Sequence, residues 1–192
     1  WTSQVKDYAI ACGWSNNGEI FNVGDVSGSI YAFGGTSGAL LWHVENVHRD
    51  GLLGLSINKE GNLLASSGQD GTVYLRNSTD GKEINKIILG KGWIEHLKWS
   101  PDSKYLAIAF SRVVYVFNSF GTEIWHSEDH PSTVSDLAWS NNNELATSCY
   151  GQVAFFDIAK NKTIQKLEWQ GSLVSMVISP NGDIVACGSQ DN

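Results

Sequence analysis

Apolar residues recur along the chain in short clusters, and the clusters return at nearly constant intervals. Each cluster ends at a bulky residue, and a polar turn of Ser, Asn, Asp, Pro or Gly follows. These residues favour tight turns, because Gly, Asn and Asp tolerate positive φ and Pro presets φ at a turn's first corner. Successive bulky residues lie 43, 42, 40 and 39 positions apart. They are Trp14, Ile57, Trp99, Trp139 and Ile178.

The segments between the turns predict β-strands. The positions five and two residues before each bulky residue are small or apolar in every repeat, which is typical of strands packed on both faces. In the second repeat three further strand-like segments follow, at 63–68, 72–75 and 82–87. No segment shows a helical period. First strands are expected over 9–14, 52–57, 94–99, 134–139 and 173–178, and the last second strand over 184–188.

Four strands in about forty residues is the signature of a propeller blade. A single four-stranded sheet cannot bury both of its faces, so each blade stacks on its neighbours around an axis. We therefore predict an all-β fold, a β-propeller of four-stranded antiparallel blades, with about four and a half blades in this chain. The repeats are expected at 5–46, 47–89, 90–128 and 129–168, with a partial repeat at 169–192.

The second repeat carries the fullest set of motifs. His48 precedes its first strand, 64–73 reads LASSGQDGTV and 79–82 reads TDGK; 99–103 (WSPDS) and 188–191 (GSQD) add related motifs elsewhere. On these residues the chain resembles the WD40-repeat family of β-propellers, which most often have seven blades. The resemblance implies that this chain is a fragment of a seven-bladed propeller. Its remaining strands, and further domains, would then belong to the same polypeptide.

Typical WD repeats hold a buried hydrogen-bonded set of His, Ser or Thr, Asp and Trp. Only the second repeat has the first three, as His48, Ser66 or Ser67, and Asp70, while its Trp position holds Arg76. We therefore expect apolar packing to hold the blades together. His130 lacks an Asp partner and is expected at the surface. Five tryptophans at repeated positions are expected to be buried wedges: Trp14, Trp42, Trp99, Trp125 and Trp139.

Two segments resemble a second propeller family. Residues 29–33 lead through Gly38 to Trp42, and residues 114–117 lead through Gly121 to Trp125. A Gly before an inter-blade Trp is similar to quinoprotein-type repeats. This resemblance leaves open an alternative function, a quinoprotein-like or hydrolytic propeller enzyme with its site in the central funnel.

The composition argues against nucleic acid as a partner and against a membrane-spanning segment. The chain has 13 basic and 20 acidic residues and a formal charge of −7, which argues against nucleic acid because phosphate binding needs clustered Lys and Arg. No apolar run approaches the ~18 residues of a membrane span. Cys12, Cys149 and Cys187 lack disulfide or metal spacing and are expected to be small buried thiols. These thiols and the lack of a leader indicate a cytoplasmic protein.

No catalytic constellation is visible. The chain has no Gly-x-Ser-x-Gly elbow, no phosphate-binding Gly loop and no His-Glu-x-x-His. Its five histidines fall at positions that do not predict a shared metal, and the acidic pair Glu128 and Asp129 is typical of a solvated loop. We therefore expect a protein that is not an enzyme and that has no cofactor and no metal.

Binding surfaces are the stronger candidates. In a propeller the loop entering the first strand and the loop between the second and third strands share one rim. Large aromatics and Arg are enriched at interface hot spots. These criteria predict a protein–protein interaction scaffold whose partner is another protein or peptide. The partner-binding candidates are Trp93, Arg112, Tyr150, Arg49 and Glu95.

Overall fold

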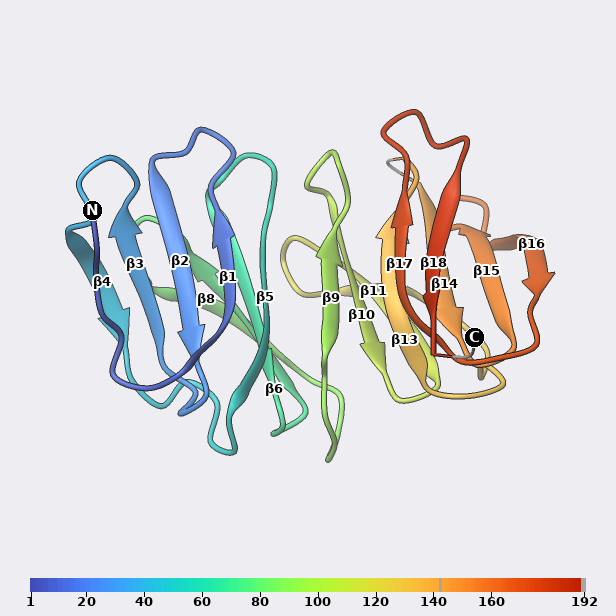
Figure 1. Cartoon of the computed structure of the whole chain (residues 1–192), viewed down its shortest axis with the longest axis horizontal. Coiled ribbons are helices and arrows are strands. Elements are labelled where there is room, and N and C mark those ends of the chain that lie inside the picture. Colours follow the sequence, from blue (N-terminus) through green and yellow to red (C-terminus); the bar gives the residue numbers. More distant parts are fainter. Residues whose placement is uncertain (142, 191–192) are drawn as a thin grey trace. The chain divides into compact units, whose positions relative to one another are not determined.

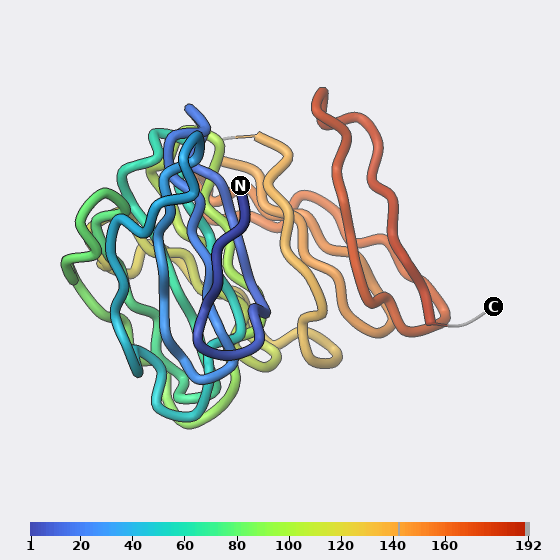
Figure 2. The backbone as a smooth tube through the Cα atoms, turned by 60° about the vertical axis from the view of Figure 1, so that its left-hand side comes forward, coloured from blue at the N-terminus to red at the C-terminus, as the bar shows by residue number. Residues whose placement is uncertain are grey.

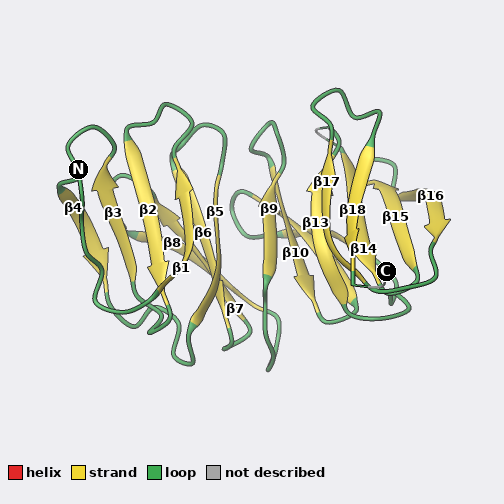
Figure 3. Cartoon of the chain, in the orientation of Figure 1, coloured by secondary structure: helices red, strands yellow, loops and turns green. Residues whose placement is uncertain are grey.

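The computed structural model describes residues 1–141 and 143–190 and contains strands but no helix in that part of the chain (Figures 1 and 3). The chain forms two compact units, Trp1–Trp99 and Ser100–Asn192. Asn142 of the fourth predicted turn, and Asp191 and Asn192 at the end of the partial repeat, lie outside the described residues.

The first unit, Trp1–Trp99, contains two four-stranded antiparallel sheets in which sequence neighbours pair, β1-β2-β3-β4 and β5-β6-β7-β8. A ninth strand, β9, ends the unit. The strands are β1 (Ala9–Trp14), β2 (Ile20–Asp25), β3 (Ile30–Gly34), β4 (Leu40–Val44), β5 (Leu52–Ile57), β6 (Leu63–Gly68), β7 (Thr72–Asn77), β8 (Glu83–Ile88) and β9 (His96–Trp99).

The second unit, Ser100–Asn192, repeats this pattern. It contains β10 to β12 paired in sequence order, the four-stranded sheet β13-β14-β15-β16 and the two-stranded sheet β17-β18. The strands are β10 (Tyr105–Phe110), β11 (Val113–Asn118), β12 (Glu123–His126), β13 (Val134–Trp139), β14 (Glu144–Cys149), β15 (Gln152–Asp157), β16 (Lys162–Glu168), β17 (Leu173–Ile178) and β18 (Val185–Ser189).

The strands agree closely with the repeat pattern. Four of the five predicted first strands have the expected bounds, whereas β9 begins two residues late, at His96, and β18 begins at Val185 rather than Ile184. One register irregularity recurs near the start of the first strand, at Leu52/Gly54 in β5 and at the matching places in β1, β13 and β17. A bulge that recurs at one repeat position is a feature of the repeat rather than a local accident.

The core of each unit lies between the faces of adjacent sheets. In the first unit Ile30, Val47, Leu52 and Leu64 form one buried cluster, with Ala11 and other residues packed against it. In the second unit the main cluster joins β10, β11 and β12 to the β13–β16 sheet, and Val116, Leu137 and Leu145 are among its members. The apolar positions that the sequence pattern identifies are therefore buried in the structure.

The tryptophan wedges are mostly as predicted, with one exception. Trp99 and Trp125 are buried, and Trp42 and Trp139 are half-buried. The prediction was wrong for Trp14, which is 51% exposed. Trp99 packs onto the preceding repeat and donates its indole N–H to the Ser56 carbonyl at 3.1 Å, whereas Trp14 stacks on Phe21 of its own sheet, 4.7 Å away.

The N-terminal segment lies along the first sheet, as the dark blue tube in Figure 2 shows. Trp1 donates its indole N–H to the Gly35 carbonyl at 2.8 Å, and the Tyr31 hydroxyl accepts a hydrogen bond from the Lys6 backbone N–H at 3.3 Å. Val5 packs against the cluster that Tyr31 belongs to. This segment thus covers part of the sheet face that would otherwise meet solvent.

Polar networks inside the sheets supplement the expected apolar packing. His48 is fully buried; its Nδ1 lies 3.1 Å from the Asp70 carboxylate and its Nε2 lies 2.9 Å from Ser66 Oγ. A carboxylate only accepts, so Nδ1 carries the proton and Nε2 accepts from Ser66. The hydroxyl of the neighbouring Ser67 has no partner among the described residues.

The first sheet has a network of its own, which the sequence analysis did not identify. Buried Asp25 accepts hydrogen bonds from the Ser27 hydroxyl at 2.6 Å, the Ser29 N–H at 3.0 Å and the Tyr31 hydroxyl at 3.1 Å. Burial raises the pKa of Tyr31, so the hydroxyl keeps its proton as the donor. The carboxylate therefore stabilises the turn between β2 and β3.

The cysteines differ from expectation. Only Cys149 is buried, and Cys12 and Cys187 are exposed; all three are free thiols. Both exposed residues lie on strands whose outward-facing neighbours are also exposed. Among the described residues no helix has the length and apolar character needed to cross a membrane.

Asn22 supplies a test of the inter-sheet packing. Its side chain is fully buried, and neither polar atom of its amide has a hydrogen-bond partner within the described part of the chain. The same repeat position holds Ala65, Ala107 and Ala146, all fully buried. We expect Asn22→Ala to raise the free energy of unfolding by about 1 kcal/mol, because it removes an unsatisfied buried amide. Urea denaturation measures the change.

The matched control is the reverse substitution, Ala65→Asn. It places an amide where none is present and is expected to lower the free energy of unfolding by about 1–3 kcal/mol. If Asn22→Ala destabilised the protein as much as Ala65→Asn, the amide of Asn22 would have a stabilising partner and the interpretation would be wrong.

His48 predicts a pH-dependent stability. Burial lowers the pKa of His48 below its usual 6.5 and outweighs the opposing effect of Asp70. Below pH 6.5 His48 is protonated in the unfolded chain but stays neutral in the folded chain. The folded state therefore loses stability as pH falls from 6.5 towards the lowered pKa. We expect His48→Gln to flatten this loss in denaturation curves between pH 7 and pH 5, and exposed His43→Gln to leave it unchanged.

Candidate functional site

Three of the predicted partner-binding residues, Trp93, Arg49 and Glu95, lie in the first unit, and all three are exposed. Trp93 is 60% exposed although the next residue, Ile94, is fully buried. The loop that carries Trp93 is anchored on both sides, because the Leu89 N–H donates to the Gly71 carbonyl at 3.0 Å and the Ile94 N–H to the Gly68 carbonyl at 3.1 Å. The indole is therefore presented to solvent by a fixed loop.

The other two predicted residues, Arg112 and Tyr150, lie in the second unit and meet at one loop. Arg112 donates its Nε–H to the His130 carbonyl at 2.7 Å and lies 3.7 Å from the Asp129 carboxylate. Tyr150 is 58% exposed, and its backbone N–H donates to Ser132 Oγ at 2.9 Å. The β12–β13 loop thus joins both residues within this unit.

His130 holds this loop from inside, and the prediction that it is exposed was wrong. Its side chain is 3% exposed, its Nδ1 lies 3.0 Å from the Arg112 carbonyl and its Nε2 lies 2.9 Å from Thr147 Oγ1. The carbonyl only accepts, so Nδ1 carries the proton. Burial lowers the pKa of His130, which favours the neutral ring. A backbone carbonyl here takes the place that Asp70 has beside His48.

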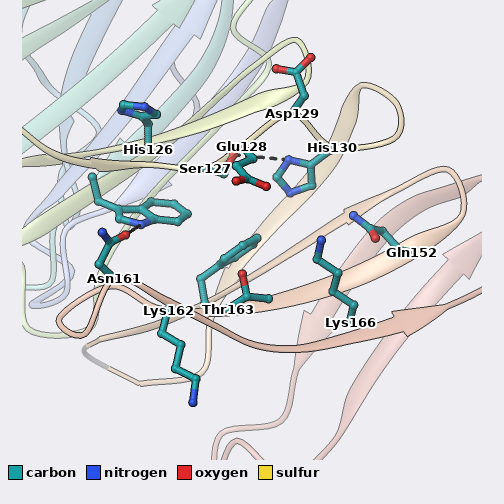
Figure 4. Close-up of a pocket in the computed structure, with 12 residues that line it drawn as sticks. His126, Ser127, Glu128, Asp129, His130, Gln152, Asn161, Lys162, Thr163 and Lys166 are labelled. Atoms are coloured by element: carbon teal, nitrogen blue, oxygen red, sulfur yellow. Dashed lines mark hydrogen bonds between the residues drawn. The ribbon is translucent and has the colours of Figure 1, made fainter.

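A hollow of about 220 Å³ lies beside the β12–β13 loop (Figure 4). β12 and the loop form one wall, and β15 and β16 form the other. Its aromatic base is Trp125 and Phe156, whose ring centroids lie 5.1 Å apart. In Figure 4 Glu128 lies next to His130, with Lys166 and Gln152 across from it.

A second hollow of about 650 Å³ adjoins the first. The two share Trp125, His126 and Asn161, and the second is also lined by apolar residues such as Tyr105 and Ile158. The Trp125 indole N–H donates to Asn161 Oδ1 at 2.7 Å, so the dividing residues are fixed in place. Together the hollows form a continuous depression whose walls carry both polar and apolar groups along its length.

Both ring nitrogens of His130 are already hydrogen-bonded, so the ring is not available as a general base. In the described part of the chain no three His, Cys, Asp or Glu side chains lie together as a metal would need. The acidic pair Glu128 and Asp129 is exposed, as the sequence indicated, but it also lines the hollow.

Sequence reasoning missed Thr147, Gln152 and Lys166. Two of them had a detectable signal. Thr147 occupies the repeat position of Ser66, the partner of His48, and Gln152 stands where other repeats have Ser29, Thr72 and Val113. Lys166 carried no signal, because exposed lysines on an outer strand are ordinary.

Comparisons with known proteins place the chain among WD-repeat proteins. Residues 97–179 match the family described as the anaphase-promoting complex subunit 4 WD40 domain, and residues 41–77 match the WD domain, G-beta repeat. Between them these two matches cover much of the chain from the first to the fourth repeat.

Curated relatives agree with the family matches. WD repeat-containing protein srw1 of Schizosaccharomyces pombe is 24% identical over 78% of this chain and 29% of its own length. Meiotic fizzy-related protein 1 of the same yeast is 23% identical over 76% of this chain and 37% of its own. Echinoderm microtubule-associated protein-like 1 of Mus musculus is 29% identical over 55% of this chain and 13% of its own length. The chain thus spans less than two fifths of each relative.

Solved structures show the same fold. A chain in the crystal structure of the mitotic checkpoint complex superposes with a TM-score of 0.86 at 19% identity, over 97% of this chain and 59% of that one. The Cps50 (Swd1) β-propeller domain of Myceliophteria thermophila superposes with a TM-score of 0.85 at 14% identity, over 99% of this chain and 64% of that one. The fold is therefore a β-propeller. The family matches to residues 41–77 and 97–179 place the chain in the WD40-repeat family.

Proposed function

We propose that this chain is a non-enzymatic scaffold that binds another protein or peptide through the rim surfaces of its propeller. One observation carries the proposal: large aromatic rings, Trp93 and Tyr150, are exposed on loops that backbone hydrogen bonds anchor. Rigid exposed aromatics lose little conformational entropy on binding, which is why such residues dominate interface energies. Arg112, Arg49 and Glu95 supply charge around them.

The names of similar proteins support this proposal. One solved relative is part of a mitotic checkpoint complex, and one family match is named for a subunit of the anaphase-promoting complex. Both names describe assemblies of several proteins. The WD40 match favours the scaffold over the quinoprotein-like or hydrolytic enzyme. The free cysteines agree with a reducing compartment such as the cytoplasm.

We also propose that the chain is part of a larger, seven-bladed propeller. Trp14 on β1 and Val177 on β17 leave large apolar areas exposed. The equivalent of Trp14 in the third repeat, Trp99, is covered by the repeat before it. This chain also corresponds to 59% and 64% of the solved propeller chains that it matches. Further blades of the same polypeptide would cover such faces.

The rim proposal is tested with the complete gene product. Proteins that bind the wild type are identified by cross-linking, and their affinities are compared for Trp93→Ala, Arg112→Ala and Tyr150→Ala. A hot-spot residue contributes about 2 kcal/mol or more, so at least one variant is expected to weaken binding about 30-fold. Arg49→Ala and Glu95→Ala are expected to have smaller effects, as charges at an interface edge do.

Phe120→Ala is the matched control. Phe120 is an exposed aromatic in the β11–β12 turn, at the opposite end of β11 from Arg112. Partner affinity is expected to stay unchanged in this variant. Equal affinity in the wild type and all five rim variants would contradict the choice of residues, and the lack of any protein partner would contradict the scaffold itself.

A further inference from the structure

The polar hollow of the second unit has one nearly buried amide side chain in its wall. Gln152 is only 9% exposed and lies at the start of β15, and its side chain lines the hollow (Figure 4). No other described residue hydrogen-bonds to its side-chain amide. The amide therefore faces the hollow, where a ligand that offers one acceptor and one donor would hydrogen-bond with it.

The charges around the hollow are also unmatched. Glu128 on the loop and Lys166 on β16 line opposite walls, and neither forms an ion pair with another described residue. Asp129 is nearer to Arg112, at 3.7 Å, and Lys162 extends away from the hollow in Figure 4. The neutral ring of buried His130 adds no charge. The site therefore has one unpaired anion and one unpaired cation on either side of an amide, and the Asp129 carboxylate also lines it.

The shape favours an elongated ligand. At about 220 Å³ the polar hollow is smaller than the roughly 300–1,000 Å³ that small-molecule sites occupy. It continues past Trp125 and Asn161 into the adjoining hollow beside Tyr105 and Ile158. An extended chain fits such a depression, since its side chains alternate in direction along the strand.

We propose that this depression binds an extended peptide segment of a partner protein. The peptide's main-chain N–H and C=O pair with the Gln152 amide, an acidic side chain meets Lys166 and a basic side chain meets Glu128. An apolar residue of the peptide occupies the adjoining hollow. The inference rests on the proposed scaffold function, because it identifies a second surface at which a protein partner docks.

A phosphate-bearing ligand fits the same walls less well. Lys166 and Gln152 would favour it, but the Glu128 and Asp129 carboxylates line the same hollow and would repel a doubly charged group. A peptide with one charge of each sign meets both walls without that repulsion.

The amide of this site departs from the repeat pattern, whereas its aromatic base follows it. At the position of Gln152 the second repeat has Thr72. Trp125 matches Trp42 of the first repeat, and Phe156 matches a Phe in the first and third repeats, so both rings are part of the blade structure. The blade does not require the amide, which leaves it available to a ligand.

The test uses the complete gene product and a phage library of random twelve-residue peptides. An enriched peptide is synthesised, and its Kd is measured for the wild type, Gln152→Leu, Lys166→Glu and Glu128→Lys. Each substitution is expected to weaken binding at least tenfold. Lys59→Glu, an exposed lysine of the first unit, has the same change in charge and is expected to bind like the wild type. Lys166 is exposed, so its variant remains informative if Gln152→Leu fails to fold.

A charge swap gives the sharper test. The double variant Lys166→Glu, Glu128→Lys is expected to select peptides in which the acidic and basic positions are exchanged. An unchanged selection would overturn the inference. Peptides that are lost with Trp93→Ala or Tyr150→Ala but not with Gln152→Leu would also overturn it, while leaving the rim scaffold intact. If no peptide is enriched, this site is rejected, and the rim experiment alone decides the scaffold.

Discussion

Stacking of sheets whose two faces are both apolar is the constraint on which the rest of this structure depends. A four-stranded sheet of this kind cannot bury both faces by itself, so it needs a neighbour on each side. The approach is close enough to dictate residue size: a Cβ on Gly24 would lie 2.6 Å from the Leu52 side chain of the next sheet. Such contacts explain why the positions five and two residues before each bulky residue are small or apolar in every repeat.

The same stacking places the polar groups at the strand ends. Asp25, His48 and His130 are all buried next to turns between second and third strands or the loops before first strands, and Asp70, the partner of His48, is half-buried. The hydrogen bonds of His130 hold the loop that joins Arg112 and Tyr150. A loop that is already ordered loses less entropy when a partner binds, so core hydrogen bonds support the rim surface at a distance.

The strands were predictable from the sequence because their signals are local. Alternating apolar positions and turn residues act within a few positions of each other, and the repeat multiplied the signal five times. Trp14 and His130 were mispredicted because their environments depend on other segments. Trp14 has the residue type of a wedge but no sheet packed on it among the described residues. His130 is satisfied by the carbonyl of Arg112, and a backbone carbonyl leaves no mark in a sequence.

The candidate sites also differ in how far the sequence alone predicts them. The rim residues were recognisable because aromatics and Arg stood at loop positions that no packing rule explains. Gln152 was recognisable only in principle, as an outlier among Ser29, Thr72 and Val113, because its meaning depends on Phe156 and Lys166 lying beside it. In a repeat protein the shared residues build the blade, since every blade needs them. Gln152 departs from the repeat and faces the hollow without a hydrogen-bond partner among the described residues, so the ligand proposed for this hollow accounts for a side chain that the blade itself does not need.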